Sequence, residues 1–209
     1  LMRALVVYCH PRADSFTAAV RDRVIARLEA AGAEVRLTDL YAEAFDPVLS
    51  EAEHRAYLDV PANRKGVDGH CAGVEWCDTL ILVYPTWWYG LPAMLKGWLD
   101  RTLLPEVAFL MPDGVNRTIR PGLTHITRFG VFTTCGASLW LTFLIGAPGK
   151  RTLLRGVRFL IARNARTVFA AHYLMDSSTA ESRSRHLDRV GRKMDRLIGP
   201  VPQAREVTA

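Results

Sequence analysis

Apolar runs and helical patterns alternate along this chain of 209 residues. Five short, largely apolar segments are predicted to be strands: 4–9, 34–40, 79–84, 129–134 and 167–173. Apolar positions recur every three or four residues in three longer segments, which are predicted to be helices: 15–31, 91–104 and 179–198. Strands that are apolar throughout and alternate with helices indicate a parallel sheet covered on both faces. We therefore expect a doubly wound α/β fold with five strands.

Two segments interrupt this alternation. Residues 46–73 are polar and contain prolines and glycines, so we expect an excursion between the second and third strands, with a short helix over 50–58. Residues 138–163 begin with an apolar stretch and continue with basic residues, including Lys150 and Arg151.

The composition is that of a globular protein. Apolar residues make up 49% of the chain and charged residues 23%, so we expect a single domain over 1–199 and a C-terminal tail over 200–209. The first apolar run is too short for a signal peptide, and the run 129–145 is shorter than the ~20 residues that span a bilayer. These features predict a cytoplasmic protein without membrane insertion.

The net charge and the cysteines exclude only a few kinds of ligand and site. The net charge of +6 would attract anionic small molecules, and nucleic acid as well. The four cysteines contain no Cys-x-x-Cys pair, which predicts buried free thiols rather than a metal site or a disulfide framework: Cys9, Cys71, Cys77 and Cys135.

In an open parallel sheet, ligands bind beyond the carboxyl ends of the strands, where the strand order reverses. The loop 10–17 after the first strand contains a histidine, an arginine, a serine and a threonine, and it leads into a helix. The free amides and the dipole of a helix N-terminus favour a phosphate at this place. The plainer alternative is that Asp14 or Ser15 only caps the helix.

Three adjacent aromatic residues, Trp87, Trp88 and Tyr89, follow the third strand. Because exposing three aromatic side chains to water stabilises nothing, we expect the cluster to pack against the core, a second subunit or a flat ligand. The turn 133–136 after the fourth strand has small residues that let another group approach the backbone closely. Together the three loops predict a cradle for a planar phosphorylated ring.

The segment 84–101, which reads YPTWWYGLPAMLKGWLDR, resembles the flavin-contacting segment of the flavodoxin-like NAD(P)H quinone oxidoreductases. Ser15-Phe16-Thr17 resembles the phosphate loop of that family, and 133–136 resembles its Thr-Thr-Gly-Gly turn. The matches keep their order and extend to about Val190. The resemblance implies a flavodoxin-like three-layer sandwich with strand order 2-1-3-4-5. It also implies a homodimer that transfers two electrons, as hydride via flavin N5, from NADH or NADPH to quinones or related acceptors.

The resemblance assigns residues to the flavin. The phosphates would be held by His10, Ser15, Phe16 and Thr17. The isoalloxazine would be lined by Pro85, Thr86, Trp87, Trp88 and Tyr89. Its pyrimidine side would contact Thr133, Thr134, Cys135 and Gly136.

The chain departs from the family pattern in three places. The mammalian-type members carry a tyrosine and a histidine where this chain has Leu141 and Ala147, so their proton relay cannot be assumed. Cys135 replaces the first glycine of the turn and could crowd the ring. These departures keep open a second hypothesis, a flavin-binding regulatory subunit that senses redox state for a partner such as a transporter. No catalytic residue besides the flavin is assigned.

Two cofactor choices stay open. FAD is weakly favoured over FMN, because the excursion 46–73 and the C-terminal helix could cover an adenosine. For the electron donor, Arg12 or the pair Lys150 and Arg151 could hold the 2′-phosphate of NADPH, whereas NADH lacks that group.

Other functions fit the sequence less well. Residues 146–152 resemble a nucleotide P-loop, but the glycine spacing is wrong. The chain has no Gly-x-Gly-x-x-Gly after its first strand, and Pro85 stands where a receiver domain needs an aspartate. The basic helix 183–193 lacks base-stacking aromatics, so we interpret it as a solvated face. His172 and His186 are interpreted as structural.

Overall fold

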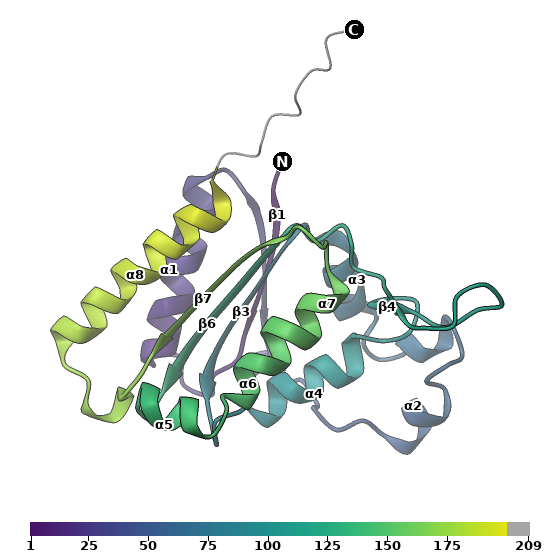
Figure 1. The fold of residues 1–209 in the computed structure, drawn as a ribbon, viewed down its shortest axis with the longest axis horizontal. Helices are drawn as coiled ribbons and strands as arrows, with labels where there is room; N and C mark the ends of the chain where they lie inside the picture. Colours follow the sequence, from purple (N-terminus) through teal and green to yellow (C-terminus); the bar gives the residue numbers. More distant parts are fainter. Residues whose placement is uncertain (200–209) are drawn as a thin grey trace, which may run out of the picture.

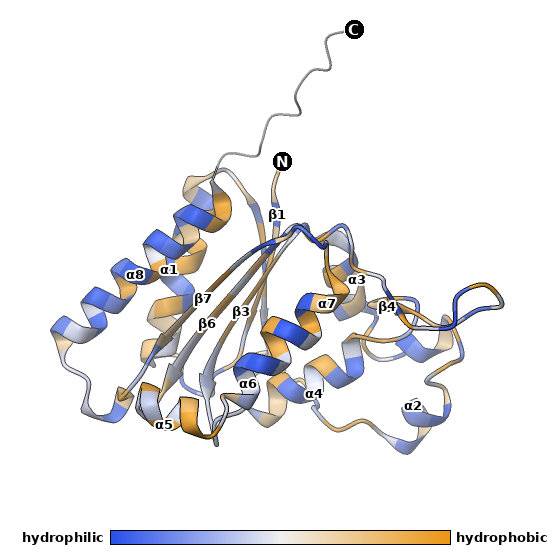
Figure 2. Cartoon of the chain, in the orientation of Figure 1, coloured by the Kyte–Doolittle hydropathy of each residue, from blue (hydrophilic) through white to orange (hydrophobic). Residues whose placement is uncertain are grey.

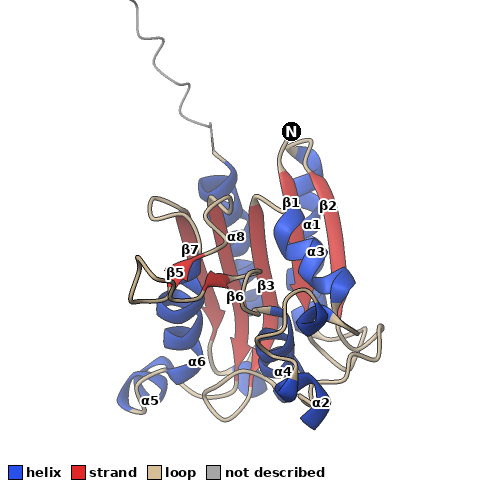
Figure 3. Ribbon diagram, turned by 90° about the vertical axis from the view of Figure 1, so that its right-hand side faces the viewer, coloured by secondary structure: helices blue, strands red, loops and turns tan. Residues whose placement is uncertain are grey.

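The computed structural model describes residues 1–199; the tail expected over 200–209 lies outside them. Five parallel strands form one sheet in the order β2-β1-β3-β6-β7, which confirms the predicted order 2-1-3-4-5 (Figure 3). The strands are β1 (Arg3–Tyr8), β2 (Glu34–Asp39), β3 (Thr79–Thr86), β6 (Arg128–Cys135) and β7 (Arg166–His172).

Helices cover both faces of the sheet, so the fold is a three-layer sandwich (Figure 1). One face carries α1 (Phe16–Ala30) and α8 (Ala180–Ile198), whose apolar sides bury Ile81 and Val83 of β3. The other face carries α3 (Asp68–Trp76), α4 (Ala93–Thr102), α6 (Pro148–Arg151) and α7 (Arg158–Leu160), and it buries Leu80 and Leu82. Alternate residues of β3 thus enter opposite cores, as the pleat of a strand requires.

The expectation that every strand is apolar throughout was wrong for β2. This strand reads EVRLTD and stays partly exposed along its length. It lies at the edge of the sheet and pairs only with β1, so it does not need the apolar side chains of an inner strand.

The two interrupting segments are more ordered than their sequences indicate. The first contains α2 (Glu51–Arg55), the 3-10 turn η1 (Ala62–Arg64) and the start of α3. The second contains α5 (Leu139–Leu144), α6, the π-helical segment η2 (Thr152–Val157) and α7. A small two-stranded sheet, β4 (Phe109–Leu110) with β5 (Arg120–Pro121), lies outside the main sheet, and the 3-10 turn η3 (Met175–Ser177) follows β7.

All four cysteines are free and buried, as predicted. Burial raises the pKa of the Cys9 and Cys77 thiols to about 12, which keeps them protonated and unreactive at neutral pH. Within residues 1–199, no helix is long and apolar enough to cross a membrane. The same residues contain no group of three or more metal-ligating side chains placed to hold a metal ion.

Candidate functional site

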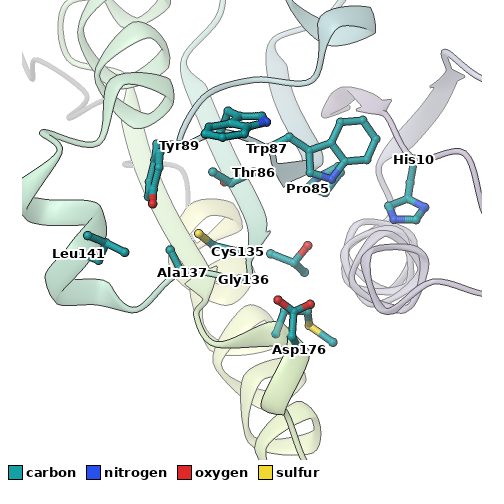
Figure 4. Close-up of a pocket in the computed structure, with 13 residues that line it drawn as sticks. His10, Pro85, Thr86, Trp87, Tyr89, Cys135, Gly136, Ala137, Leu141 and Asp176 are labelled. Atoms are coloured by element: carbon teal, nitrogen blue, oxygen red, sulfur yellow. The ribbon is translucent and has the colours of Figure 1, made fainter.

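A cavity of about 670 Å³ opens where β1, β3 and β6 end. Nine of the residues assigned to the flavin line it: His10, Pro85, Thr86, Trp87, Trp88, Tyr89, Thr134, Cys135 and Gly136. Figure 4 shows His10 on one side of this space and Tyr89 on the other, with Asp176 beside the glycine turn. The three loops chosen from the sequence therefore meet at one place, because the carboxyl ends of parallel strands share one edge of the sheet.

The aromatic turn is held in a strained conformation. Trp88 and Tyr89 have φ angles of 49° and 61°, in the left-handed region that costs a residue with a side chain about 1–2 kcal/mol. The turn is closed by a bond of 2.9 Å from the Gly90 amide to the Trp87 carbonyl, and Gly149 N–H donates to the Tyr89 carbonyl at 3.1 Å. This geometry brings Tyr89 to the cavity and leaves Trp88 94% exposed.

The start of α1 follows the His10 side of the cavity, but Ser15, Phe16 and Thr17 do not themselves line it. Ser15 is the N-cap, and its hydroxyl accepts the Ala18 amide at 3.1 Å. Ser15 therefore caps the helix, as the plainer alternative predicted. The amides of Phe16 and Thr17 lie in the first turn, where no carbonyl of the helix is available to accept them. Thr17 Oγ1 lies 3.1 Å from Thr134 Oγ1, so it ties the helix start to the turn after β6.

His10 and Arg12 differ in their readiness to bind an anion. His10 Nδ1 lies 3.0 Å from the Arg12 amide nitrogen and 3.2 Å from the Arg12 carbonyl oxygen, so the backbone of this loop holds the ring in place. Burial holds the pKa of His10 below its ordinary value. Arg12, in contrast, forms a bidentate pair with Asp14, with distances of 3.0 and 2.8 Å, so its charge is already matched.

The turn after β6 supplies the floor of the cavity. Thr133 lies behind it, where its Oγ1 is 2.7 Å from Thr86 Oγ1. Cys135 lines the cavity, and its thiol is buried with the sulfur 3.9 Å from Thr142 Oγ1. A Cβ added to Gly136 would lie 2.7 Å from Asp176 Oδ2. The glycine thus lets the Asp176 carboxylate approach the turn.

The sequence analysis missed Ala137, Met175 and Asp176, which also line the cavity. The last two belong to η3, the turn that follows β7. The loop after the fifth strand reaches the same edge of the sheet as the other three, and that topological signal could have identified it.

A second cavity of about 400 Å³ lies beside α1 and the first turns of α8. His172, His186, Arg185 and Arg189 line it together with several serines. Phe16 does not reach the main cavity; its ring packs 5.4 Å from His172 and 6.0 Å from His186, between ring centroids. The two histidines are packed in the structure, as interpreted, and they also face a cavity.

Two polar atoms in this second cavity are buried without a hydrogen-bond partner, His172 Nδ1 and His186 Nε2. Burial, with the nearby charges of His172 and Arg189, lowers the pKa of His186 to about 4. The His186 ring is therefore neutral at pH 7.

Residues 2–193 match a family described by its flavodoxin-like fold. The chain is 31% identical to NAD(P)H dehydrogenase [quinone] 1 from Cavia porcellus over 52% of its own length and 46% of that protein. It is 37% identical to the uncharacterized NAD(P)H oxidoreductase YcaK from Escherichia coli, over 47% of its own length and 51% of that protein. The chain thus spans about half the length of these curated relatives.

Solved structures extend the similarity over nearly the whole chain. A crystal structure of Smu.1420 from Streptococcus mutans has 26% identity and a TM-score of 0.78, and covers 92% of this chain and 98% of its own. The NAD(P)H:quinone oxidoreductase from Methanothermobacter marburgensis has 22% identity and a TM-score of 0.78, with coverage of 96% and 98%. The second similarity concerns the fold alone.

Proposed function

Because the chain belongs to the family with the flavodoxin-like fold, we propose that it is a flavin-dependent oxidoreductase. In this proposal it takes two electrons from NADH or NADPH and passes them to a quinone or a related acceptor. The observation that carries the proposal is the cavity in which His10 from the loop before α1, the aromatic turn and the open glycine turn meet. The names of the two curated relatives support the same reaction class.

The residues of the cavity fit a flavin. Its volume of about 670 Å³ lies within the usual range for small-molecule sites. Tyr89 and Trp87 provide aromatic walls against which a planar ring stacks and which exclude water from it. Pro85, Thr86 and Trp88 complete this side in the proposal.

The two ends of the cavity differ in polarity, as a phosphorylated ring requires. In the proposal, a ring N–H of His10 and the amides of Phe16 and Thr17 donate to phosphate oxygens. At the other end the proposal places Thr133, Thr134, Cys135 and Gly136 near the polar edge of the ring. Asp176 offers an acceptor there for a ring N–H or a sugar hydroxyl.

A bound flavin supplies the hydride chemistry, and the protein positions the reactants. Leu141 lines the cavity and Ala147 lines the small chamber behind Tyr89, so neither can hold or move a proton. The proposal therefore assigns no side chain to the proton step. This is also the observation behind the second candidate, a flavin-binding subunit that reports redox state to a partner protein.

We favour FAD over FMN because of the second cavity. FAD adds a second phosphate and an adenosine, and this cavity offers the guanidinium groups of Arg185 and Arg189 from α8. FMN is the flavin in one structural relative, a Bacillus anthracis azoreductase with 14% identity and a TM-score of 0.74. If this chain binds FMN, which lacks the adenosine, the second cavity has no part in holding the flavin.

We also propose a homodimer that closes the site. Trp88 is 94% exposed on the cavity rim, and the neighbouring α5 presents Trp140 and Leu144 to solvent. Figure 2 shows apolar residues on α5 at the same end of the sheet. Large apolar side chains gathered at a cavity mouth are typical of an interface.

The test is an absorbance spectrum of the purified protein, followed by release of the chromophore and its identification by mass. We expect a flavin band that NADPH or NADH bleaches and a quinone restores, with the mass of FAD. A flavin that is reduced without turnover of a quinone would favour the regulatory subunit. A protein that contains no flavin and takes none up would refute both functions.

A further inference from the structure

A separate hollow of about 330 Å³ lies between α5 and the helical segment that begins with α6. Phe143 and Leu154 form apolar walls, and Lys150, Arg151 and Arg155 surround them with positive charge. None of the proposed flavin contacts lies in this hollow.

The charges of this hollow are not balanced by the protein. Within residues 1–199, Arg151 and Arg155 form no ion pair and no side-chain hydrogen bond, and no acidic residue lines the hollow. The two arginines are four residues apart on one helical segment, a spacing that brings like charges together and is unfavourable without an anion. Lys150 differs, because its ammonium lies 4.7 Å from the centre of the Phe169 ring.

The hollow is next to the main cavity. Leu141 lines the main cavity and Phe143 lines the hollow, and both belong to α5, whose six residues span about 9 Å. Gly149, at the start of the same basic segment, donates to the Tyr89 carbonyl at the cavity wall. Ala147 and Lys150 line both the hollow and the small chamber behind Tyr89, so a long ligand whose reactive ring enters the cavity can reach the hollow past these two residues.

We propose that this hollow binds the adenosine 2′-phosphate of NADPH, so that the protein prefers NADPH to NADH. The inference rests on the proposed function. A phosphate dianion between two guanidinium groups matches their planar donors, and the exposed Phe143 ring offers a face on which adenine stacks. Arg12, the other basic candidate from the sequence, is already paired with Asp14.

The decisive probe is a pair of nucleotides that differ only in the 2′-phosphate. Adenosine 2′,5′-bisphosphate and adenosine 5′-monophosphate are titrated calorimetrically into the flavin-loaded protein, so that no adenylate site of the flavin is open. We expect the bisphosphate to bind at least about tenfold more tightly. In the Arg151→Ala/Arg155→Ala variant this difference should disappear, while binding of the monophosphate should not change.

Two further double variants test whether the position of the two arginines and their planar shape matter, rather than positive charge alone. Arg163→Ala/Arg192→Ala removes two exposed arginines elsewhere on the surface and should keep the preference. Arg151→Lys/Arg155→Lys keeps the charge but loses the planar donors, and should retain only part of it. The ratio of kcat/KM for NADPH and NADH should follow the nucleotide binding in all variants.

The outcomes separate the inference from the proposed function. The inference is overturned if the wild type binds the two nucleotides equally. It is also overturned if Arg163→Ala/Arg192→Ala loses the preference for the bisphosphate as Arg151→Ala/Arg155→Ala does. If NADH still bleaches the flavin in that case, the proposed function stands. Tight binding of the bisphosphate by a protein whose flavin neither NADH nor NADPH reduces overturns the NADPH assignment and the proposed function together.

Discussion

At the scale of single residues, the aromatic turn divides its side chains between two roles. Tyr89 is half-buried at the cavity wall, Trp87 is 42% exposed near His10, and Trp88 is almost fully exposed. Because two adjacent residues in the left-handed region are costly, the turn persists only where its surroundings determine it, and such strain is concentrated at functional sites.

Tyr89→Ala and Trp87→Ala should each weaken flavin binding by about tenfold or more, since each removes an aromatic wall worth roughly 1–3 kcal/mol in stacking. Neither side chain belongs to the buried core, so the thermal unfolding midpoint should change little. Flavin fluorescence titration and thermal unfolding measure the two effects. Trp76→Ala is the matched control, because Trp76 packs under Arg36 away from the cavity. A large loss of stability with full flavin occupancy would place these aromatics in the core instead.

The residues of the cavity could be predicted from the sequence better than their individual orientations. Each loop follows a strand, so its position was fixed by topology. Phe16 illustrates the limit: it belongs to the phosphate loop by sequence, but its ring packs against His172 and His186 from β7 and α8. A contact with residues so distant in the chain has no local sequence signal.

At the scale of elements, α4 depends on a glycine for its contact with the preceding segment. A Cβ on Gly97 would overlap the backbone of Pro47. In an isolated helix Gly→Ala stabilises by about 1 kcal/mol, whereas overpacking against a backbone costs about 1–3 kcal/mol or more. Gly97→Ala should therefore lower the free energy of unfolding, as measured by denaturant titration.

The matched control for Gly97 is Gly69→Ala in α3. A Cβ there meets nothing within 4 Å, so this variant should be neutral or up to about 1 kcal/mol more stable. The same sign of change in both glycine variants would contradict the proposed packing of α4.

His186 makes the anchoring of α8 sensitive to pH. The folded pKa of about 4 lies below the ordinary value of 6.5, so the folded state disfavours the charged ring. The resulting stabilisation is complete above pH 6.5 and is lost as the pH falls towards 4, by about 3 kcal/mol in all. His186→Phe should flatten this part of the stability curve, measured on the flavin-free protein, whereas the exposed His54→Gln should not. An unchanged curve in His186→Phe would assign the pH dependence to other groups.

The main elements could be predicted because their patterns are strong and local. All five strands and the helices α1, α4 and α8 lie within two residues of the predicted bounds at each end. The helix α3 was not predicted because Asp68-Gly69-His70 reads as a polar turn, and the helix is stabilised by burial of Cys71 and Val74. Similarly, Pro148 and Gly149 read as helix breakers, although proline fits the first turn of α6 and Gly149 packs against Gly90.

At the scale of the whole molecule, we propose that a second copy of the chain completes the site on the side of α5 and Trp88. The cavity wall is made by one chain, but its rim presents large apolar side chains to water. In our proposal their cover is a second copy of the chain, which neither the hydrophobic pattern nor the fold of one copy can identify. A measurement of the oligomeric state can identify this cover.

Trp140→Asp tests the proposed dimer directly. Trp140 is 69% exposed on α5, and buried tryptophans at interfaces commonly contribute 2 kcal/mol or more, so the dimer dissociation constant should rise by roughly 30-fold or more. Sedimentation velocity over a concentration series measures this change. Val115→Asp, at a side chain that is 90% exposed between β4 and β5, makes the same kind of change away from the cavity and should leave the dimer intact.

If Trp140→Asp still sediments as a dimer, or the wild type sediments as a monomer, α5 does not form the interface and the cavity is closed by another element or not at all. If the variant is monomeric, its flavin should also dissociate more readily, because the partner that covers Trp88 no longer excludes water from the ring.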